Sequence, residues 1–123
     1  MGLDMFARTT AQDIEAVDFD APEDSVEIHY WRKHPNLHGW MERLYRAKGG
    51  QREQFNVTPV RLDVEDLDAL ERDIRDKTLP FTEGFFFGRS ERTPEERADD
   101  LAFVAIARGA IESGLKVYYS SWW

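Results

Sequence analysis

The chain has 123 residues, of which 41% are hydrophobic and 33% charged, a balance typical of one soluble globular domain with a real core. It contains no cysteine, which excludes disulfides, cysteine-ligated zinc and thiol catalysis. The net charge of −8 disfavours direct binding to nucleic acid, because phosphate neutralisation by Lys and Arg supplies most of that affinity.

The charges are unevenly spread along the chain. Residues 31–52 hold six bases and one acid, whereas residues 9–27 hold seven acids and no Lys or Arg. These stretches are either solvated loops and helix faces or a bipolar surface that steers charged partners. Residues 1–6 lack the basic and apolar regions of a signal peptide, and no apolar run approaches the roughly 18 residues of a membrane span. We therefore expect a cytoplasmic protein with no membrane contact.

The first half of the chain predicts two strands and a helix. Alternating side chains indicate strands over residues 3–9 and 26–32, joined by an acidic surface connection at 11–24. Pro35 suits the first turn of a helix, where its missing N–H costs nothing, and Gly49-Gly50 ends that helix. Its apolar stripe is Leu37, Trp40, Met41, Leu44 and Tyr45.

The second half predicts two more helices between strands. Residues 55–62 indicate a third strand, 84–88 a short apolar strand or extended loop, and 115–123 a final strand. Asp63 is placed to cap one helix, and Thr93-Pro94-Glu95-Glu96 is a capping box for the next. The expected buried sides are Val64, Leu67, Leu70 and Ile74 in the first of these helices, and Leu101, Val104, Ala105, Arg108 and Ile111 in the second.

Together these elements predict a single α+β domain over residues 1–123. We expect about five mostly antiparallel strands and about three helices packed mainly on one face of the sheet.

Nine of the sixteen aromatic residues lie in four runs, at positions 30–31, 85–87, 118–119 and 122–123. Neighbouring residues on a strand point to opposite faces, and helices on one side cover only one of them. The remaining rings are therefore either covered by loops and the acidic segment, or form a patch for a protein partner, a second copy or a planar ligand.

The segment from Tyr30 to Trp40 carries most of the unusual chemistry. Arg32 and Lys33, followed by a helix N-terminus, predict an anion site in which Trp31 or Trp40 stacks on a base. The spacing of His29, His34 and His38 completes no familiar zinc motif, so we expect no metal and no cofactor. We expect His38 to bond to Glu42 or the backbone at the core edge.

No sequence motif assigns a catalytic residue. The chain has no phosphate-binding loop, no dinucleotide-binding glycine motif and no strand–turn–helix elbow around Ser120 or Ser121. Whether the protein is an enzyme stays open.

Several short motifs follow one another over nearly the whole chain. They are Met1-Gly2-Leu3-Asp4-Met5, Tyr30-Trp31-Arg32-Lys33 with Leu37-His38-x-Trp40, Leu79-Pro80, Gly84-Phe85-Phe86-Phe87-Gly88 and Tyr118-Tyr119-Ser120-Ser121-Trp122-Trp123. In these the chain resembles a family of small uncharacterised proteins from bacteriophage and prophage-like bacterial genomes. The resemblance implies that Asp4, the Tyr-Trp-Arg-Lys block, His38, Trp40 and residues 84–88 belong to a shared core or site.

Two functions follow as predictions. The first is a phage-related interaction module that binds a protein partner, or a second copy of itself, through an aromatic patch with charged flanks. The alternative is a binder of, or small enzyme acting on, an anionic and nucleotide-like small molecule at residues 30–40. The candidate contact residues for the two functions are Tyr30, Trp31, Arg32, Lys33, His38, Trp40, Phe86, Tyr118 and Trp122.

Overall fold

A computed structural model of the chain describes residues 2–82 and 88–123, which form a four-stranded sheet and three helices. In chain order the elements are β1 (Asp4–Thr10), β2 (Val26–Arg32), α1 (Pro35–Ala47), β3 (Val60–Leu62), α2 (Val64–Arg75), α3 (Pro94–Glu112) and β4 (Lys116–Trp122). The predicted α+β class is confirmed. No helix in the described part of the chain has both the length and the apolar character needed to cross a bilayer.

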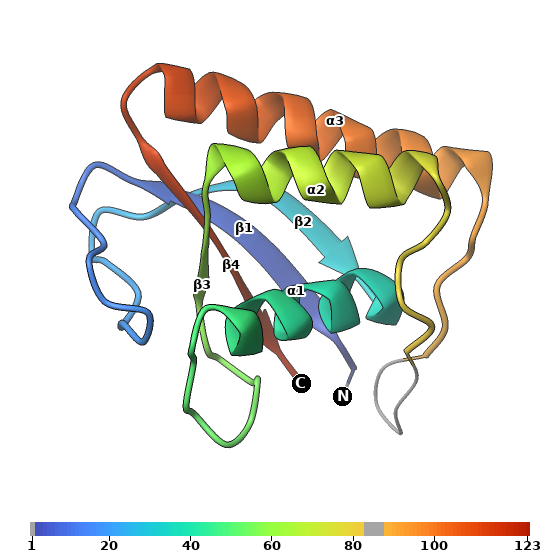
Figure 1. Cartoon of the computed structure of the whole chain (residues 1–123), viewed down its shortest axis with the longest axis horizontal. Coiled ribbons are helices and arrows are strands. Elements are labelled where there is room, and N and C mark those ends of the chain that lie inside the picture. Colours follow the sequence, from blue (N-terminus) through green and yellow to red (C-terminus); the bar gives the residue numbers. More distant parts are fainter. Residues whose placement is uncertain (1, 83–87) are drawn as a thin grey trace.

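The strands lie in the order β2-β1-β4-β3, and every neighbouring pair is antiparallel. Figure 1 shows all three helices in front of one face of this sheet, with α2 and α3 side by side and α1 below them. The side chains of Met5 and Ala7 on β1 are fully buried beneath the helices, as the alternation of the sequence predicts. The helices therefore cover one face and leave the other to loops and solvent.

The prediction of about five strands is wrong in detail. Within the described residues, only Val60–Leu62 of the predicted third strand has strand geometry, and it pairs with β4. Val57 also donates its N–H to the Ser121 carbonyl of β4 at 2.7 Å, but its φ of 55° interrupts the strand. Pro59 has no N–H to give to a ladder, and the Phe55 carbonyl is already occupied by the indole N–H of Trp123 at 3.0 Å. The other predicted strand, 84–88, lies outside the described residues except for Gly88.

The helix starts agree with the capping signals. Asp63 and Asp66 form a reciprocal capping box at the start of α2, and the Thr93 hydroxyl accepts the Glu96 N–H at 3.1 Å at the start of α3. The buried faces of α2 and α3 both differ from the prediction. Val64 is 43% exposed, because it lies in the first turn of α2 beyond the edge of the core.

Helix α3 is rotated relative to the predicted stripe. It buries Phe103, Val104 and Ala107, whereas Ala105 is exposed. The rotation carries Asp100 to the inside, where it is 1% exposed and hydrogen-bonded to two residues of the β2–α1 region. Asp100 thus shares the buried face of α3 with Phe103, Val104 and Ala107.

Candidate functional site

The chain turns sharply between β2 and α1. Lys33 has a φ of 54°, in the left-handed region, and its N–H donates to the Leu3 carbonyl at 2.8 Å. His34 then precedes α1, and Pro35 occupies the first helical position. No side chain at the N-cap position caps this helix; instead the Ser90 hydroxyl accepts the Asn36 N–H at 3.0 Å from a distant part of the chain.

This turn places His34 in a buried polar network. The His34 ring is bonded through Nδ1 to the Ser90 hydroxyl at 2.7 Å and through Nε2 to Asp100 Oδ2 at 2.9 Å. The second carboxylate oxygen of Asp100 accepts the Trp31 indole N–H at 3.1 Å. His34 and Asp100 are 3% and 1% exposed, so this pair is removed from solvent.

Glu96 joins the network from the first turn of α3. One turn before Asp100 on the same helix, it lies with Oε1 3.6 Å from His34 Nε2. Its carboxylate accepts the backbone N–H groups of Glu91 at 2.7 Å and Arg92 at 3.2 Å. Glu96 therefore bonds to the two residues before the N-cap Thr93, and not to the Thr93 N–H as in a capping box. These bonds hold its carboxylate beside the His34 imidazole.

Two cavities open on either side of this network. A cavity of about 270 Å³, here called the basic cavity, is lined by Asn36, Ile74, Lys77, Leu79, Arg92, Glu96, Arg97 and Asp100. A cavity of about 300 Å³, here called the acidic cavity, is lined by Tyr30, Trp31, Arg32, Lys33, His34, Glu91, Glu95, Glu96 and Asp99. Cations outnumber carboxylates three to two in the first, whereas carboxylates outnumber cations four to two in the second.

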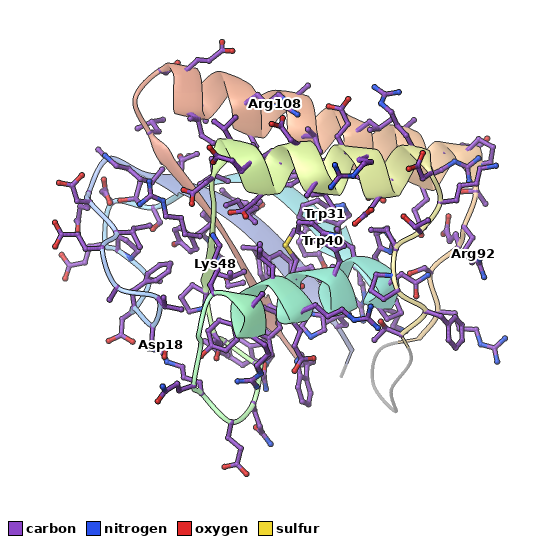
Figure 2. All side chains as sticks on the ribbon, viewed as in Figure 1. Asp18, Trp31, Trp40, Lys48, Arg92 and Arg108 are labelled. Carbon is purple, nitrogen blue, oxygen red and sulfur yellow. The ribbon has the colours of Figure 1, made fainter. Side chains whose placement is uncertain are left out.

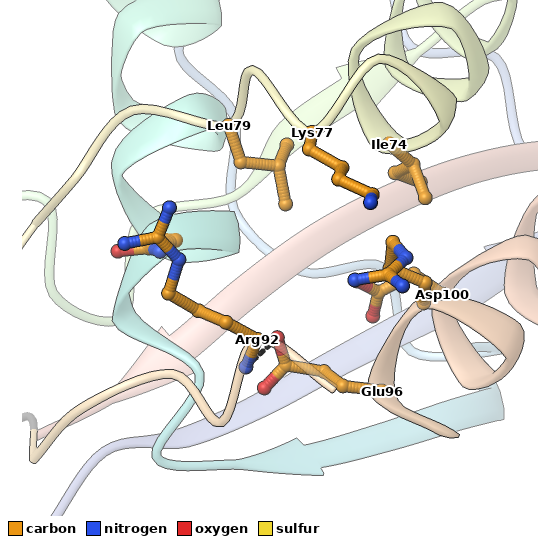
Figure 3. A pocket seen from close by; sticks show the side chains of 8 residues that line it. Ile74, Lys77, Leu79, Arg92, Glu96 and Asp100 are labelled. Atoms are coloured by element: carbon orange, nitrogen blue, oxygen red, sulfur yellow. Dashed lines mark hydrogen bonds between the residues drawn. The ribbon is translucent and has the colours of Figure 1, made fainter. Parts of the chain in front are cut away.

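The basic cavity lies between the end of α2 and the start of α3. Figure 3 shows Lys77 extending into it from the wall that carries Ile74 and Leu79, opposite Arg92 and Glu96. Within residues 2–82 and 88–123, no carboxylate lies within ion-pair distance of Lys77, Arg92 or Arg97, all of which are outside the set of salt bridges in the described chain. The two carboxylates of the cavity are already held by His34, Trp31 and backbone N–H groups.

Two of these cations also lie on strained backbone. Lys77 has a φ of 60° and Arg92 a φ of 58°. A residue with a Cβ is unfavourable in this left-handed region by about 1–2 kcal/mol. Such strain collects at binding and catalytic sites, where the surrounding structure holds it.

Four of the candidate contact residues meet at the acidic cavity. Tyr30, Trp31, Arg32 and Lys33 all line it, although the indole of Trp31 is turned into the core and only 5% of that residue is exposed. Figure 2 shows Trp31 and Trp40 in the layer between the sheet and the helices. Because four carboxylates share this cavity with Arg32 and Lys33, the excess of positive charge lies in the neighbouring basic cavity instead.

His38 and Trp40 lie apart from this region. His38 is 1% exposed, stacks near Phe55 and bonds through Nδ1 to the Tyr119 hydroxyl at 2.7 Å, so the expected contact with Glu42 at the core edge is wrong. Burial lowers the pKa of His38 from 6.5 to about 4. Trp40 donates its indole N–H to Asp73 at 2.8 Å and is 9% exposed. Both side chains are therefore packed in the interior and do not line the acidic cavity.

The uncovered face of the sheet carries a row of rings. Phe6 pairs across the strands with Tyr30, and Trp122 pairs with Asp4 on the other side of β1. Tyr30 is 45% and Trp122 68% exposed. We call Phe6, Tyr30 and Trp122 the aromatic row.

The connection between β1 and β2, residues 11–25, covers a different part of the same sheet face and not the aromatic row. Phe19 packs edge-on against Tyr118, whose hydroxyl donates to Ser25 at 2.6 Å, and Tyr118 is fully buried. Tyr118 is therefore removed from the predicted contact patch, while Trp122 stays in it. Phe86 lies outside the described residues.

Sequence reasoning missed Ser90, Glu96 and Asp100. Glu96 and Asp100 are four positions apart on the most strongly signalled helix, which places them on one face. Nothing in their spacing indicates that this face meets His34, because the contact joins residues 66 positions apart. Comparison with protein-family models, with curated proteins and with solved structures gave no match.

Proposed function

We propose that the protein binds a small phosphorylated molecule in the basic cavity, next to the segment in which the sequence predicts an anion site. The observation that carries this proposal is the group of three cationic side chains, Lys77, Arg92 and Arg97, that line one concavity without an ion-pair partner among the described residues. Cations that only serve solubility have no reason to converge on a cavity, because their mutual repulsion is lowest when they are spread over the surface.

The composition of the cavity also favours an oxyanion. Two guanidinium groups present planar pairs of N–H donors that match phosphate oxygens, and Lys77 adds a mobile point charge. Ile74 and Leu79 supply an apolar wall against which a sugar or a base packs. The volume of about 270 Å³ is near the lower limit for small-molecule sites and suits a sugar phosphate or the phosphate end of a nucleotide.

A thermal-shift panel of sugar phosphates and mononucleotides tests this proposal, with titration calorimetry for any compound that stabilises the protein. A Lys77→Gln/Arg97→Gln variant is expected to lose the stabilisation. The matched control is Arg72→Gln, because Arg72 is an exposed cation on α2 that does not line the basic cavity. No stabilisation by any compound, or equal stabilisation of the double variant, would refute phosphate binding in this cavity.

The aromatic row supports a second candidate function, self-association through the open sheet face. On the same face, two acidic and two basic residues border its rings. Asp4 lies opposite Arg32 across the strands, and Arg8 lies opposite Glu27. The Arg8 guanidinium lies 4.4 Å from the Phe6 ring centre. Because acids and bases alternate around the rings, the face is complementary to a copy of itself turned about a two-fold axis.

Light scattering tests self-association directly. A dimer mass is expected for the wild-type chain and a monomer mass for Tyr30→Ser/Trp122→Ser, because that variant removes the two most exposed rings of the row. Ile106→Ser is the control, since Ile106 is 45% exposed on α3, in the helix layer on the opposite face of the sheet. A monomeric wild type at concentrations well above those in the cell would refute this second function.

A further inference from the structure

We propose that His34, Glu96 and Asp100 form a binding site for a divalent transition-metal ion. One ligand atom from each residue lies within 4.8 Å of the other two, and two of the three residues are buried. The ion would lie between the two cavities, since His34 lines one of them, Asp100 the other and Glu96 both. This metal site is a separate proposal from the binding of a phosphorylated molecule, because it depends on one imidazole and two carboxylates and not on the cations of the basic cavity.

The atoms that face away from the cluster are all held by groups outside it. His34 Nδ1 bonds to the Ser90 hydroxyl at 2.7 Å, and Asp100 Oδ1 accepts the Trp31 indole N–H at 3.1 Å. Glu96 Oε2 accepts the Glu91 N–H at 2.7 Å. Metal ligands are oriented in this way by outer hydrogen bonds. Glu96 Oε1, the atom nearest His34 Nε2, also accepts the Arg92 N–H at 3.2 Å, and its second lone pair is the one that an ion would use.

The separations suit coordination after a small adjustment. His34 Nε2 is 2.9 Å from Asp100 Oδ2 and 3.6 Å from Glu96 Oε1. Tetrahedral ligands with bonds of about 2.0–2.1 Å lie about 3.3 Å from one another, which falls between these two distances. Coordination through Nε2 requires the neutral His34 tautomer that carries its single proton on Nδ1, and this N–H donates to Ser90, whose hydroxyl serves as donor or acceptor.

The ligand types restrict the metal. One imidazole nitrogen with two carboxylate oxygens suits Zn²⁺, Mn²⁺ or Fe²⁺ better than Mg²⁺ or Ca²⁺, which take oxygen ligands. Three protein ligands also leave a coordination position open, as in catalytic rather than structural zinc sites. Glu96 and Asp100 also line the basic cavity with its three cations, so an anion bound there would lie next to the ion.

The test is titration of the tag-free protein, in a phosphate-free buffer, with Zn²⁺ by calorimetry and with Co²⁺ by visible absorption. We expect one Zn²⁺ per chain and Co²⁺ absorption bands. Glu96→Gln is expected to weaken Zn²⁺ binding by at least about tenfold, while its amide oxygen still accepts the Glu91 N–H. The control is Glu112→Gln, an exposed carboxylate at the other end of α3.

Histidine NMR then identifies the ligand without relying on a buried substitution. Zn²⁺ is expected to shift the ring signals of His34 and to leave those of His29 and His38 in place. Saturable binding that Glu96→Gln retains at full strength, a shift of His29 instead of His34, or no saturable binding would each overturn the metal site. None of these measurements involves a phosphorylated ligand, so the result is independent of phosphate binding in the basic cavity.

Discussion

Lys77 combines a cation that points into the basic cavity with a backbone conformation that favours glycine. It follows the C-cap residue Asp76 of α2 with a φ of 60°, and its N–H donates to the Ile74 carbonyl at 3.2 Å. Glycine is the residue that most often occupies this position after a helix, because it has no Cβ to clash. The Lys77→Gly variant therefore tests two effects of this residue separately: its effect on the stability of the fold and its effect on the affinity for a ligand.

The two effects of Lys77→Gly have opposite signs. Removing the Cβ relieves about 1.5 kcal/mol of left-handed strain. The greater freedom of glycine in the unfolded chain takes back about 0.7 kcal/mol. The net gain of about 0.8 kcal/mol raises Tm by about 3 °C for a domain of this size. Loss of a charge-assisted hydrogen bond of about 1.5 kcal/mol lowers the affinity for a phosphorylated ligand about tenfold.

Urea unfolding and calorimetric titration with a stabilising compound measure the two effects on the same samples. Lys77→Gln removes the charge and keeps the strain, so it is expected to bind as weakly as Lys77→Gly without the gain in stability. Unchanged affinity in both variants would refute the role of Lys77 in binding. A loss of stability in Lys77→Gly would show that the left-handed backbone is not strained in the way assumed here.

Three further outcomes follow from burial and packing. His38 has a pKa of about 4 in the folded protein and 6.5 in the unfolded chain, so between these pH values only the unfolded chain binds a proton at this residue. The free energy of unfolding, measured in urea at pH 7 and 4.5, should therefore fall on acidification, by up to about 3 kcal/mol at full effect. The His38→Gln variant should show a smaller fall. Gly39→Ala should destabilise the protein by about 1–2 kcal/mol, because its Cβ would lie 2.0 Å from the Thr82 hydroxyl oxygen, and Thr82→Ala should recover part of this in a double variant. Gly109→Ala should instead stabilise α3 by up to about 1 kcal/mol, since no atom lies within 4 Å of its added Cβ; thermal unfolding that shifts both glycine variants in the same direction would contradict these two expectations.

The elements that the sequence predicts well are those with strong local signals. Pro35 fixes the start of α1, and the capping residues Asp63 and Thr93 fix the starts of α2 and α3. The alternation gives the faces of β1 and of the end of β2 correctly, so that Trp31 is buried and Tyr30 exposed. At the start of β2 it is wrong, because a register shift beside Ala7 and Arg8 turns Glu27 to the face of Tyr30. Local hydrogen bonding and side-chain periodicity determine these features, and both are visible in a single sequence.

The features that the sequence does not predict depend on distant contacts. His38 is expected at the edge of the core beside the apolar stripe of α1, and contact with Tyr119 from β4 completes its burial. The third strand is short because Val57 has a left-handed φ of 55° and the Phe55 carbonyl accepts the Trp123 indole N–H instead of a strand N–H. Asp100 reads as a solvent-exposed residue of α3 until His34 and Trp31 are placed beside it.

The position of Asp100 also bears on which function the molecule serves. A buried hydrogen-bonded pair such as His34–Asp100 adds little net stability, and apolar residues of the same volume often stabilise a domain as well or better. In the described part of the chain, three of the four non-glycine residues with a positive φ, Lys33, Lys77 and Arg92, line the two cavities beside the His34–Asp100 pair. The buried His34–Asp100 pair, three cations on one cavity and backbone strain thus coincide at one end of the domain. The aromatic row is also flanked by cations, Arg8 and Arg32, but it has neither a buried polar pair nor left-handed backbone, so we rank ligand binding above self-association as the proposed function.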